Sequence, residues 1–292
     1  MNGPGSSGPA YNPGGLSDAD FQRLGERIHR VFGIRLPASA RGILSETLGQ
    51  RLRQQGISSL GDYLDWVLGA DGPEEELIRC VDFITTRKRE FFKEPAQLEY
   101  LARTALPDLI KTQGAGVRRS LMVWCAGCAS GEETYTLTIV LREFAAHYPG
   151  INLNAQVLAT DVSARALDHS RAAIYDQEEV LPIPVSLKKK YLLRSKDPHR
   201  RQVRMVPELR GMVRFRRLNL MDDEFGLRER MDIIFCRDLL IFFDPATQDR
   251  LIHQFCRNMI PGGFLFVGPS ESLAQRGLPL VQVAPSVYRL PD

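Results

Sequence analysis

The chain has 292 residues, of which 43% are hydrophobic and 25% are charged, and its formal net charge is +3. This composition is typical of a globular protein that holds one large domain or two smaller ones. There is no run of about 18 apolar residues and no basic-then-apolar N-terminus, which argues against membrane insertion and against a secretory signal. The five cysteines have no framework spacing, so we expect a reducing, cytoplasmic location.

The first third of the chain predicts a disordered lead-in followed by a helical domain. Residues 1–15 are mostly Gly, Pro, Ser and Asn, with almost no apolar content. Over residues 16–92, apolar residues recur at helical spacing in four stretches, and no strand pattern appears before about residue 115. The second stretch is expected to bury Ile43, Leu44, Leu48 and Leu52 and to leave Arg41, Arg51 and Arg53 available to solvent.

The remainder, residues 93–292, predicts an α/β domain with a doubly wound, Rossmann-like sheet. Short apolar runs typical of buried parallel strands alternate with helical patterns, which implies right-handed crossovers. A closing pair of antiparallel strands is expected between residues 281 and 290. The predicted buried strands are Leu121–Trp124, Ala155–Ala159, Met231–Phe235 and Phe264–Val267.

A strongly basic region lies within this domain, over residues 186–217. It holds twelve Lys or Arg against two acids, a local charge of +10 that leaves −7 for the rest of the chain. Alternation at Val203, Met205, Val213 and Phe215 indicates short strands, so a small β subdomain is expected there. The charge favours a polyanion or an acidic protein surface as partner, and a solvated basic face without a partner is the alternative.

Candidate functional residues follow the predicted strands, because ligands of open α/β sheets bind outside the carboxyl ends of the strands. The first strand leads through small residues into a helix that begins with two acids, Glu132 and Glu133. Asp161 follows the second strand, where an acid can accept hydrogen bonds from a ribose diol. The other candidates at strand ends are Gly127, Gly131, Asn219, Arg237 and Asp238.

The loop after the first strand favours a cationic cofactor over a nucleotide polyphosphate. Residues Ala126–Gly131 lack a full G-x-G-x-x-G, and Glu132 stands where a phosphate-binding loop requires Lys. Acids beside the loop suit the sulfonium and ammonium groups of S-adenosylmethionine. Cys125 and Cys128 form a C-x-x-C, so a redox site is an alternative, whereas no Cys or His spacing indicates a metal site.

Several motifs also occur in the order found in a known protein family. They are Ile84–Thr86, Phe91–Pro95, Trp124–Glu133, Ala159–Val162, Leu218–Leu220, Ile234–Asp238, Ile241–Asp244 and Pro261–Ser272. With these motifs, residues 16 to 290 resemble the CheR family of chemotaxis receptor methyltransferases. The resemblance implies a helical domain and a methyltransferase domain with an inserted β subdomain. It also implies methyl transfer from S-adenosylmethionine to receptor glutamates, with S-adenosylhomocysteine as the product.

The resemblance also implies roles for individual residues. Glu133 and Asp161 would hold the amino-acid and ribose parts of the cofactor. The residues that would border the adenine and the methyl-donor side are Asn219, Leu220, Arg237 and Asp238. The cofactor-binding set is completed by Arg87, Arg89, Lys93 and Gly127. Lys93 and Phe242 are the candidates for catalysis.

Five positions depart from the family pattern. Arg87 and Arg89 stand where Asn and Thr are usual, Lys93 replaces Arg, Asp238 replaces Asn, and Phe242 replaces Tyr. Lys retains a positive charge but lacks the bidentate fork of Arg, and Phe cannot donate a hydrogen bond. A glutamate carboxylate is already ionised at neutral pH, so transfer needs no general base. Weakened or redirected transfer is one consequence, and a docking module that binds cofactor without transfer is the alternative function.

A methyltransferase for RNA or small molecules is a third hypothesis, based on the basic region. Grooves for single-stranded nucleic acid interleave basic and aromatic residues, and here Tyr191 and Phe215 stand almost alone. The resemblance implies a methyl-accepting chemoreceptor or related signalling protein as the partner, and we expect it to dock through the basic region. No nucleic-acid partner is expected, and the chain is expected to be a monomer.

Overall fold

The computed structural model describes residues 15–55, 57, 59–69, 72–85, 89–148, 150–197, 199–273 and 276–291. All of the predicted lead-in except Gly15 lies outside the described residues. By its contacts the chain divides into two units. One comprises Met1–Thr86 with Phe242–Asp244, and the other comprises Arg87–Ile241 with Pro245–Asp292. The segment just before Lys93, which the sequence places in the helical domain, therefore belongs to the second unit.

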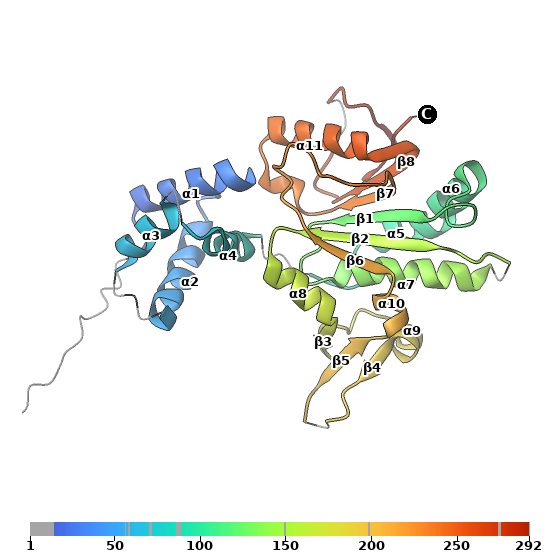
Figure 1. The fold of residues 1–292 in the computed structure, drawn as a ribbon, viewed down its shortest axis with the longest axis horizontal. Helices are drawn as coiled ribbons and strands as arrows, with labels where there is room; N and C mark the ends of the chain where they lie inside the picture. Colours follow the sequence, from blue (N-terminus) through green and yellow to red (C-terminus); the bar gives the residue numbers. More distant parts are fainter. Residues whose placement is uncertain are drawn as a thin grey trace, which may run out of the picture. The chain divides into compact units, whose positions relative to one another are not determined.

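The first unit contains four helices among its described residues (Figure 1): α1 (Asp18–Phe32), α2 (Ala40–Gln55), α3 (Leu60–Leu68) and α4 (Glu74–Ile84). The start of α1 is fixed by Ser17, whose side chain accepts a hydrogen bond from the backbone N–H of Asp20. It ends at Gly33, which adopts the left-handed conformation with φ 69°. Between these ends Leu24, Ile28 and Phe32 are buried at helical spacing.

One prediction for α2 is wrong, and another holds only in part. Ile43 is 56% exposed, because the buried stripe is set by Leu44, Leu48 and Leu52, and the residue before Leu44 lies about 100° away around the helix. Arg51 was expected to be available to solvent, but only 24% of its side chain is exposed, because its Nε and Nη2 donate to the buried carboxylate of Glu76 at 3.1 and 2.6 Å. Tyr63 Oη donates to the same carboxylate at 2.5 Å, so this network belongs to the interior of the unit.

A seven-stranded sheet forms the centre of the second unit, in the order β6-β2-β1-β7-β8-β10-β9 (Figure 1). The strands are β1 (Leu121–Ala126), β2 (Ala155–Asp161), β6 (Val213–Arg217), β7 (Met231–Cys236), β8 (Met259–Val267), β9 (Val281–Ala284) and β10 (Val287–Arg289). Strands β6, β2, β1, β7 and β8 run parallel, and β10 joins β8 and β9 in antiparallel pairs. Their carboxyl ends therefore meet at one edge, as the sequence predicts.

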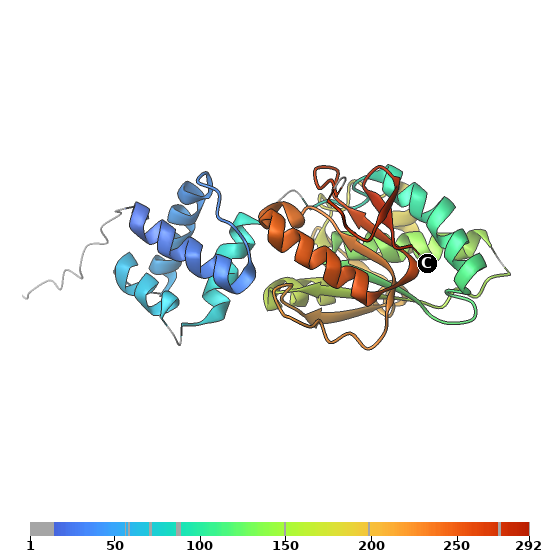
Figure 2. The ribbon, with the colours of Figure 1, turned by 90° about the horizontal axis from the view of Figure 1, so that it is seen from above.

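Helices cover both faces of this sheet (Figure 2). They are α5 (Pro95–Tyr100), α6 (Leu106–Gln113), α7 (Glu132–His147), α8 (Ala164–Ala172) and α11 (Pro245–Asn258), with a π-helix at Leu101–Ala105 and a 3-10 turn at Leu240–Phe242. Alternate side chains of β1 show the two faces. Val123 and Cys125 share a core with Leu137 of α7, whereas the Trp124 ring lies 5.2 Å from Phe255 of α11. None of the described helices combines the length and apolar character that a bilayer crossing requires.

The small β subdomain is a three-stranded antiparallel sheet in the order β3-β5-β4. Its strands are β3 (Ile174–Asp176), β4 (Leu192–Arg194) and β5 (Gln202–Met205), accompanied by α9 (Val185–Tyr191) and α10 (Pro207–Arg210). The predicted range of 186–217 is wrong at both ends. The subdomain begins earlier, at Ile174, and the alternating segment around Phe215 is β6, an edge strand of the main sheet paired with β2. Alternation reveals a half-exposed strand but not the strand with which it pairs.

Candidate active site

The loop after β1 brings backbone close to the edge where the parallel strands end. Gly127 has φ 74°, and a Cβ there would lie 2.8 Å from a methyl carbon of Leu239, so this turn requires glycine. The N–H groups of Gly127 and Cys128 donate to the carbonyl oxygen of Thr160 at 2.8 and 2.9 Å. The loop is therefore fastened to the end of the neighbouring strand β2.

Asp161, the last residue of β2, holds the same loop through its side chain. Its Oδ2 accepts from the N–H of Ala129 and its Oδ1 from the N–H of Ser163, each at 2.9 Å. The carboxylate remains half-exposed and each oxygen has a second lone pair. It can thus organise the loop and still accept hydrogen bonds from a ligand hydroxyl group.

Glu133, in the first turn of α7, is paired with Arg237, which follows β7. Arg237 Nε donates to Glu133 Oε1, and the Cys125 thiol lies 3.4 Å from Glu133 Oε2. The Arg237 side chain is only 5% exposed, and its Nη1 also donates to the carbonyl of Lys93 at 3.0 Å and to Gln97 Oε1 at 3.2 Å. Arg237 therefore connects the turn after β7 with the first turn of α7 and with the segment from Lys93 to Gln97. The Glu133 side chain is 18% exposed.

Lys93 and Asp238, two of the residues that depart from the family pattern, form an ion pair. Lys93 Nζ donates to Asp238 Oδ2, and the two side chains are 30% and 22% exposed. Asp238 has φ 58°, a left-handed conformation that Asp adopts more readily than most residues. Its backbone N–H donates to Glu271 Oε2 at 2.9 Å.

Glu271 is a site residue that the sequence analysis did not single out. It is 5% exposed and follows β8, in a turn that begins at Gly268. Burial raises its pKa, although backbone N–H donors act in the opposite direction. The signal for it is the same as for the other candidates, because Glu271 is a polar residue that closely follows a parallel strand, β8.

The remaining predicted residues are placed as follows. Asn219 follows β6, beside the end of β2, since Leu218 N–H donates to the Asp161 carbonyl at 3.1 Å. Its Oδ1 accepts from Met221 N–H at 3.0 Å, and Leu220 is 8% exposed. Arg89 Nη1 lies 3.4 Å from Ser130 Oγ in the loop after β1.

Two predicted residues are not placed with this set. Arg87 lies outside the described residues. Phe242 groups with the helical unit, where its carbonyl accepts from Arg35 N–H at 2.9 Å.

The cysteines of the C-x-x-C give no support to the redox alternative. Cys125 and Cys128 are buried free thiols, and burial raises the pKa of each well above its ordinary value. A thiol of this kind does not supply the thiolate that redox chemistry requires. Within the described ranges, no three His, Cys, Asp or Glu residues group as a metal site would require.

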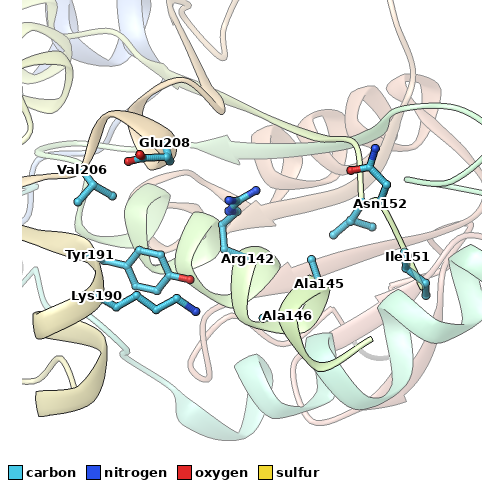
Figure 3. Close-up of a pocket in the computed structure, with 10 residues that line it drawn as sticks. Arg142, Ala145, Ala146, Ile151, Asn152, Lys190, Tyr191, Val206 and Glu208 are labelled. Carbon is cyan, nitrogen blue, oxygen red and sulfur yellow. The ribbon is translucent and has the colours of Figure 1, made fainter. Parts of the chain in front are cut away.

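A pocket of about 490 Å³ lies elsewhere in the second unit (Figure 3). It is lined by Arg142, Ala145, Ala146, Ile151, Asn152, Leu153, Lys190, Tyr191, Val206 and Glu208. Arg142 is ten residues beyond Glu132 on α7, about 15 Å along the helix at 1.5 Å per residue. The pocket is therefore separate from the strand-end site. Lys190 in its lining is paired with Glu143 at 2.6 Å, so this side chain brings no unopposed charge to the pocket.

Comparison with known proteins gives matches over nearly the whole chain. The family described as "CheR methyltransferase, SAM binding domain" matches residues 87–285, and "CheR methyltransferase, all-alpha domain" matches residues 19–85. A "Chemotaxis protein methyltransferase" of Borreliella burgdorferi is 31% identical, over 94% of this chain and 95% of that protein. Proteins of the same name from Klebsiella aerogenes and Escherichia coli are 34% and 31% identical, each over 89% of this chain and 85% and 86% of their own lengths.

Among solved structures, the CcbJ methyltransferase from Streptomyces caelestis is 16% identical, with a TM-score of 0.33. That match covers 60% of this chain and 52% of the other. The family matches confirm the predicted fold class, a helical domain followed by a Rossmann-like domain with a small antiparallel sheet. They also confirm S-adenosylmethionine as the cofactor.

Proposed function

The chain belongs to the CheR methyltransferase family, and we propose that it transfers a methyl group from S-adenosylmethionine to glutamate carboxylates of a chemoreceptor or receptor-like partner. One observation carries the proposal most directly. The segment before α5, the first turn of α7 and the turn after β7 are joined in a single connected set of Lys93, Glu133, Arg237 and Asp238. S-adenosylhomocysteine is the expected product.

The donor set at the strand ends suits this cofactor. Glu133 and Asp161 present partly exposed carboxylates on either side of the small-residue loop, which can meet an ammonium group and a ribose diol. Asn219 and Leu220, beside the end of β2, are proposed to border the adenine. When bound, the cofactor supplies a methyl group on a sulfonium that is ready for nucleophilic attack.

The protein's contribution to transfer would be mainly to orient the substrate carboxylate. Positioning of this kind can supply roughly 7 to 11 kcal/mol. Lys93 is proposed to attract the carboxylate, and its pairing with Asp238 fixes where its ammonium group lies. Because the acceptor loses its charge as the ester forms, the attraction to Lys93 weakens on transfer and the neutral product is held less tightly than the substrate.

Two measurements on the full chain test the proposal. Calorimetry with S-adenosylhomocysteine should show saturable binding, and labelled methyl groups should pass from cofactor to receptor-containing membranes as a base-labile carboxyl ester. Binding without transfer to any receptor tested would favour the docking module. Methyl incorporation that is RNase-sensitive and absent from protein would favour an RNA substrate, against which the burial of Tyr191 argues.

The basic region is proposed to dock on an acidic stretch of the receptor. Arg200 and Arg201 are exposed in the turn between β4 and β5, and Arg200 has an i,i+3 contact with Asp197 at 3.5 Å. We expect Arg200→Glu with Arg201→Glu to raise the KM for receptor and leave S-adenosylhomocysteine affinity unchanged. A charge-matched control is Arg103→Glu with Lys111→Glu, at exposed positions near α6. Equal effects of the two double variants on KM would reject docking through this region.

Two further expectations remain proposals. A monomer is proposed, and light scattering on the purified protein measures it. A cytoplasmic location is proposed from the unpaired state of all five cysteines, which suits a reducing compartment.

A further inference from the structure

We propose that Glu271 is a positioning residue for methyl transfer, because it holds the turn after β7 in the conformation that directs Asp238 toward Lys93. The proposal rests on the function proposed above. Glu271 is buried, with 5% of the residue exposed, whereas the side chains of Lys93 and Asp238 are 30% and 22% exposed. It would therefore act through these two residues and not by touching the substrate.

One carboxylate connects the turns that follow two neighbouring strands. Glu271 Oε2 accepts from the N–H of Gly268, which follows β8, at 2.6 Å, and from the N–H of Asp238, which follows β7, at 2.9 Å. Its Oε1 accepts from the N–H of Ile241 at 3.2 Å. The turn from Asp238 to Ile241 is thus held at both of its ends by a single side chain.

The conformation of Asp238 depends on such support. Its φ of 58° is uncommon for a residue with a Cβ, and the bond from its N–H to Glu271 fixes the peptide group just before that torsion. Close packing adds to the constraint, since a Cβ on Gly268 would lie 2.7 Å from Glu271 Oε2 and 3.0 Å from the N–H nitrogen of Asp238. The turn therefore has little room to adopt another arrangement.

The carboxylate is chemically specific for this role. It faces three N–H donors and offers only acceptors, whereas the amide of Gln would turn an NH₂ group toward at least one of them. Glu271→Gln keeps the volume of the side chain and removes this match. We expect the turn to shift, Asp238 to move away from Lys93, and the ammonium group to lose its fixed position.

The test compares Glu271→Gln in two backgrounds, using the full chain. In the wild-type background we expect kcat to fall about 10- to 100-fold, as expected for misplacement on the ångström scale, with S-adenosylhomocysteine affinity unchanged. In an Asp238→Ala background the same substitution should cause little further loss, because the residue it positions is already absent. An equal loss of kcat in both backgrounds would overturn the proposal, as would a parallel loss of cofactor affinity.

A control separates positioning from general stability. Asp232→Asn alters another buried carboxylate that accepts a backbone N–H, from Met122 at 2.7 Å, but at the opposite end of β7. It should lower the thermal midpoint and leave the kcat of the folded protein unchanged. If Glu271→Gln lowers only the thermal midpoint, as Asp232→Asn should, its role is structural and the proposal fails.

A readout independent of turnover distinguishes this proposal from the proposed function. The ion pair with Asp238 engages the Lys93 amine, so an amine-reactive reagent should modify Lys93 faster in Glu271→Gln, where that contact is lost, than in the wild type, as mass spectrometry of its peptide would show. Equal rates would reject the positioning of the pair even in an active enzyme. Faster modification in a chain that transfers no methyl would support the positioning and reject the enzyme.

Discussion

At the scale of single residues, two departures from the family pattern prove to be partners. Lys93 and Asp238 are 145 positions apart in sequence but form one ion pair. The sequence identified both residues and their unusual chemistry, because each lies in a motif or directly after an apolar strand. It could not show that the two side chains pair, since a spatial pair of this kind leaves no periodic pattern in the chain.

The pair predicts a measurable dependence on the charge of Lys93. Lys93→Met keeps much of the side-chain length and removes the ammonium group, so kcat should fall. The loss should be smaller than the 10²- to 10³-fold typical of a donor to developing charge, because the substrate carboxylate loses charge during transfer. Transfer assays measure the loss, with the exposed Lys111→Met as control. An unchanged kcat would exclude Lys93 from catalysis.

At the scale of elements, the strands with continuous apolar runs were predictable, whereas the sheet to which the edge strand β6 belongs was not. Strands β1, β2, β7 and β8 lie where their buried runs indicate, because a strand covered on both faces reads as a mostly apolar run with few polar positions. The alternation of polar and apolar residues in β6 fits a strand of a small peripheral sheet as well as it fits an edge strand of the main sheet. Only its pairing with β2, which is distant in sequence, places it in the main sheet.

Strand β7 carries an ion pair at its amino end that predicts a stability effect. Asp232 is fully buried and accepts from Arg119 at 2.5 and 3.0 Å and from the backbone of Met122 at 2.7 Å. Asp232→Ala leaves the Met122 N–H and the Arg119 guanidinium without this acceptor and should cost about 3 kcal/mol. Denaturant unfolding measures the cost. Asp223→Ala, at an exposed acid, is the control and should be nearly neutral.

At the scale of the whole molecule, each unit has its own interior, and the helical unit contains a carboxylate that links its stability to pH. Burial alone would raise the pKa of Glu76, but hydrogen bonds from Arg51 and Tyr63 outweigh that effect and hold the pKa below its ordinary value of 4.5. A lowered pKa means that the contribution of Glu76 is present above pH 4.5 and is lost as the pH falls through the pKa of the folded state.

The lowered pKa of Glu76 predicts how the stability of the helical unit falls at acidic pH. Between about pH 7 and pH 3, the thermal midpoint of the helical unit should fall more steeply in the wild type than in Glu76→Gln, which lacks the titrating group. Tyr63→Phe removes one donor and should shift the loss toward higher pH. Circular dichroism melts at a series of pH values report these slopes. Identical slopes in the wild type and Glu76→Gln would show that other carboxylates govern acid unfolding.

The helical unit is also discontinuous in the chain, which has a consequence for its biosynthesis. Phe243 forms a β-bridge with Ile34, and Asp244 Oδ2 lies 3.1 Å from His29 Nε2. These partners are separated by roughly 200 residues, which a ribosome adds in about 10 to 40 seconds at 5–20 residues per second. The four helices therefore emerge long before the segment that completes their unit. Nascent chains halted before residue 242 should be more sensitive to protease within α1 than chains released after it.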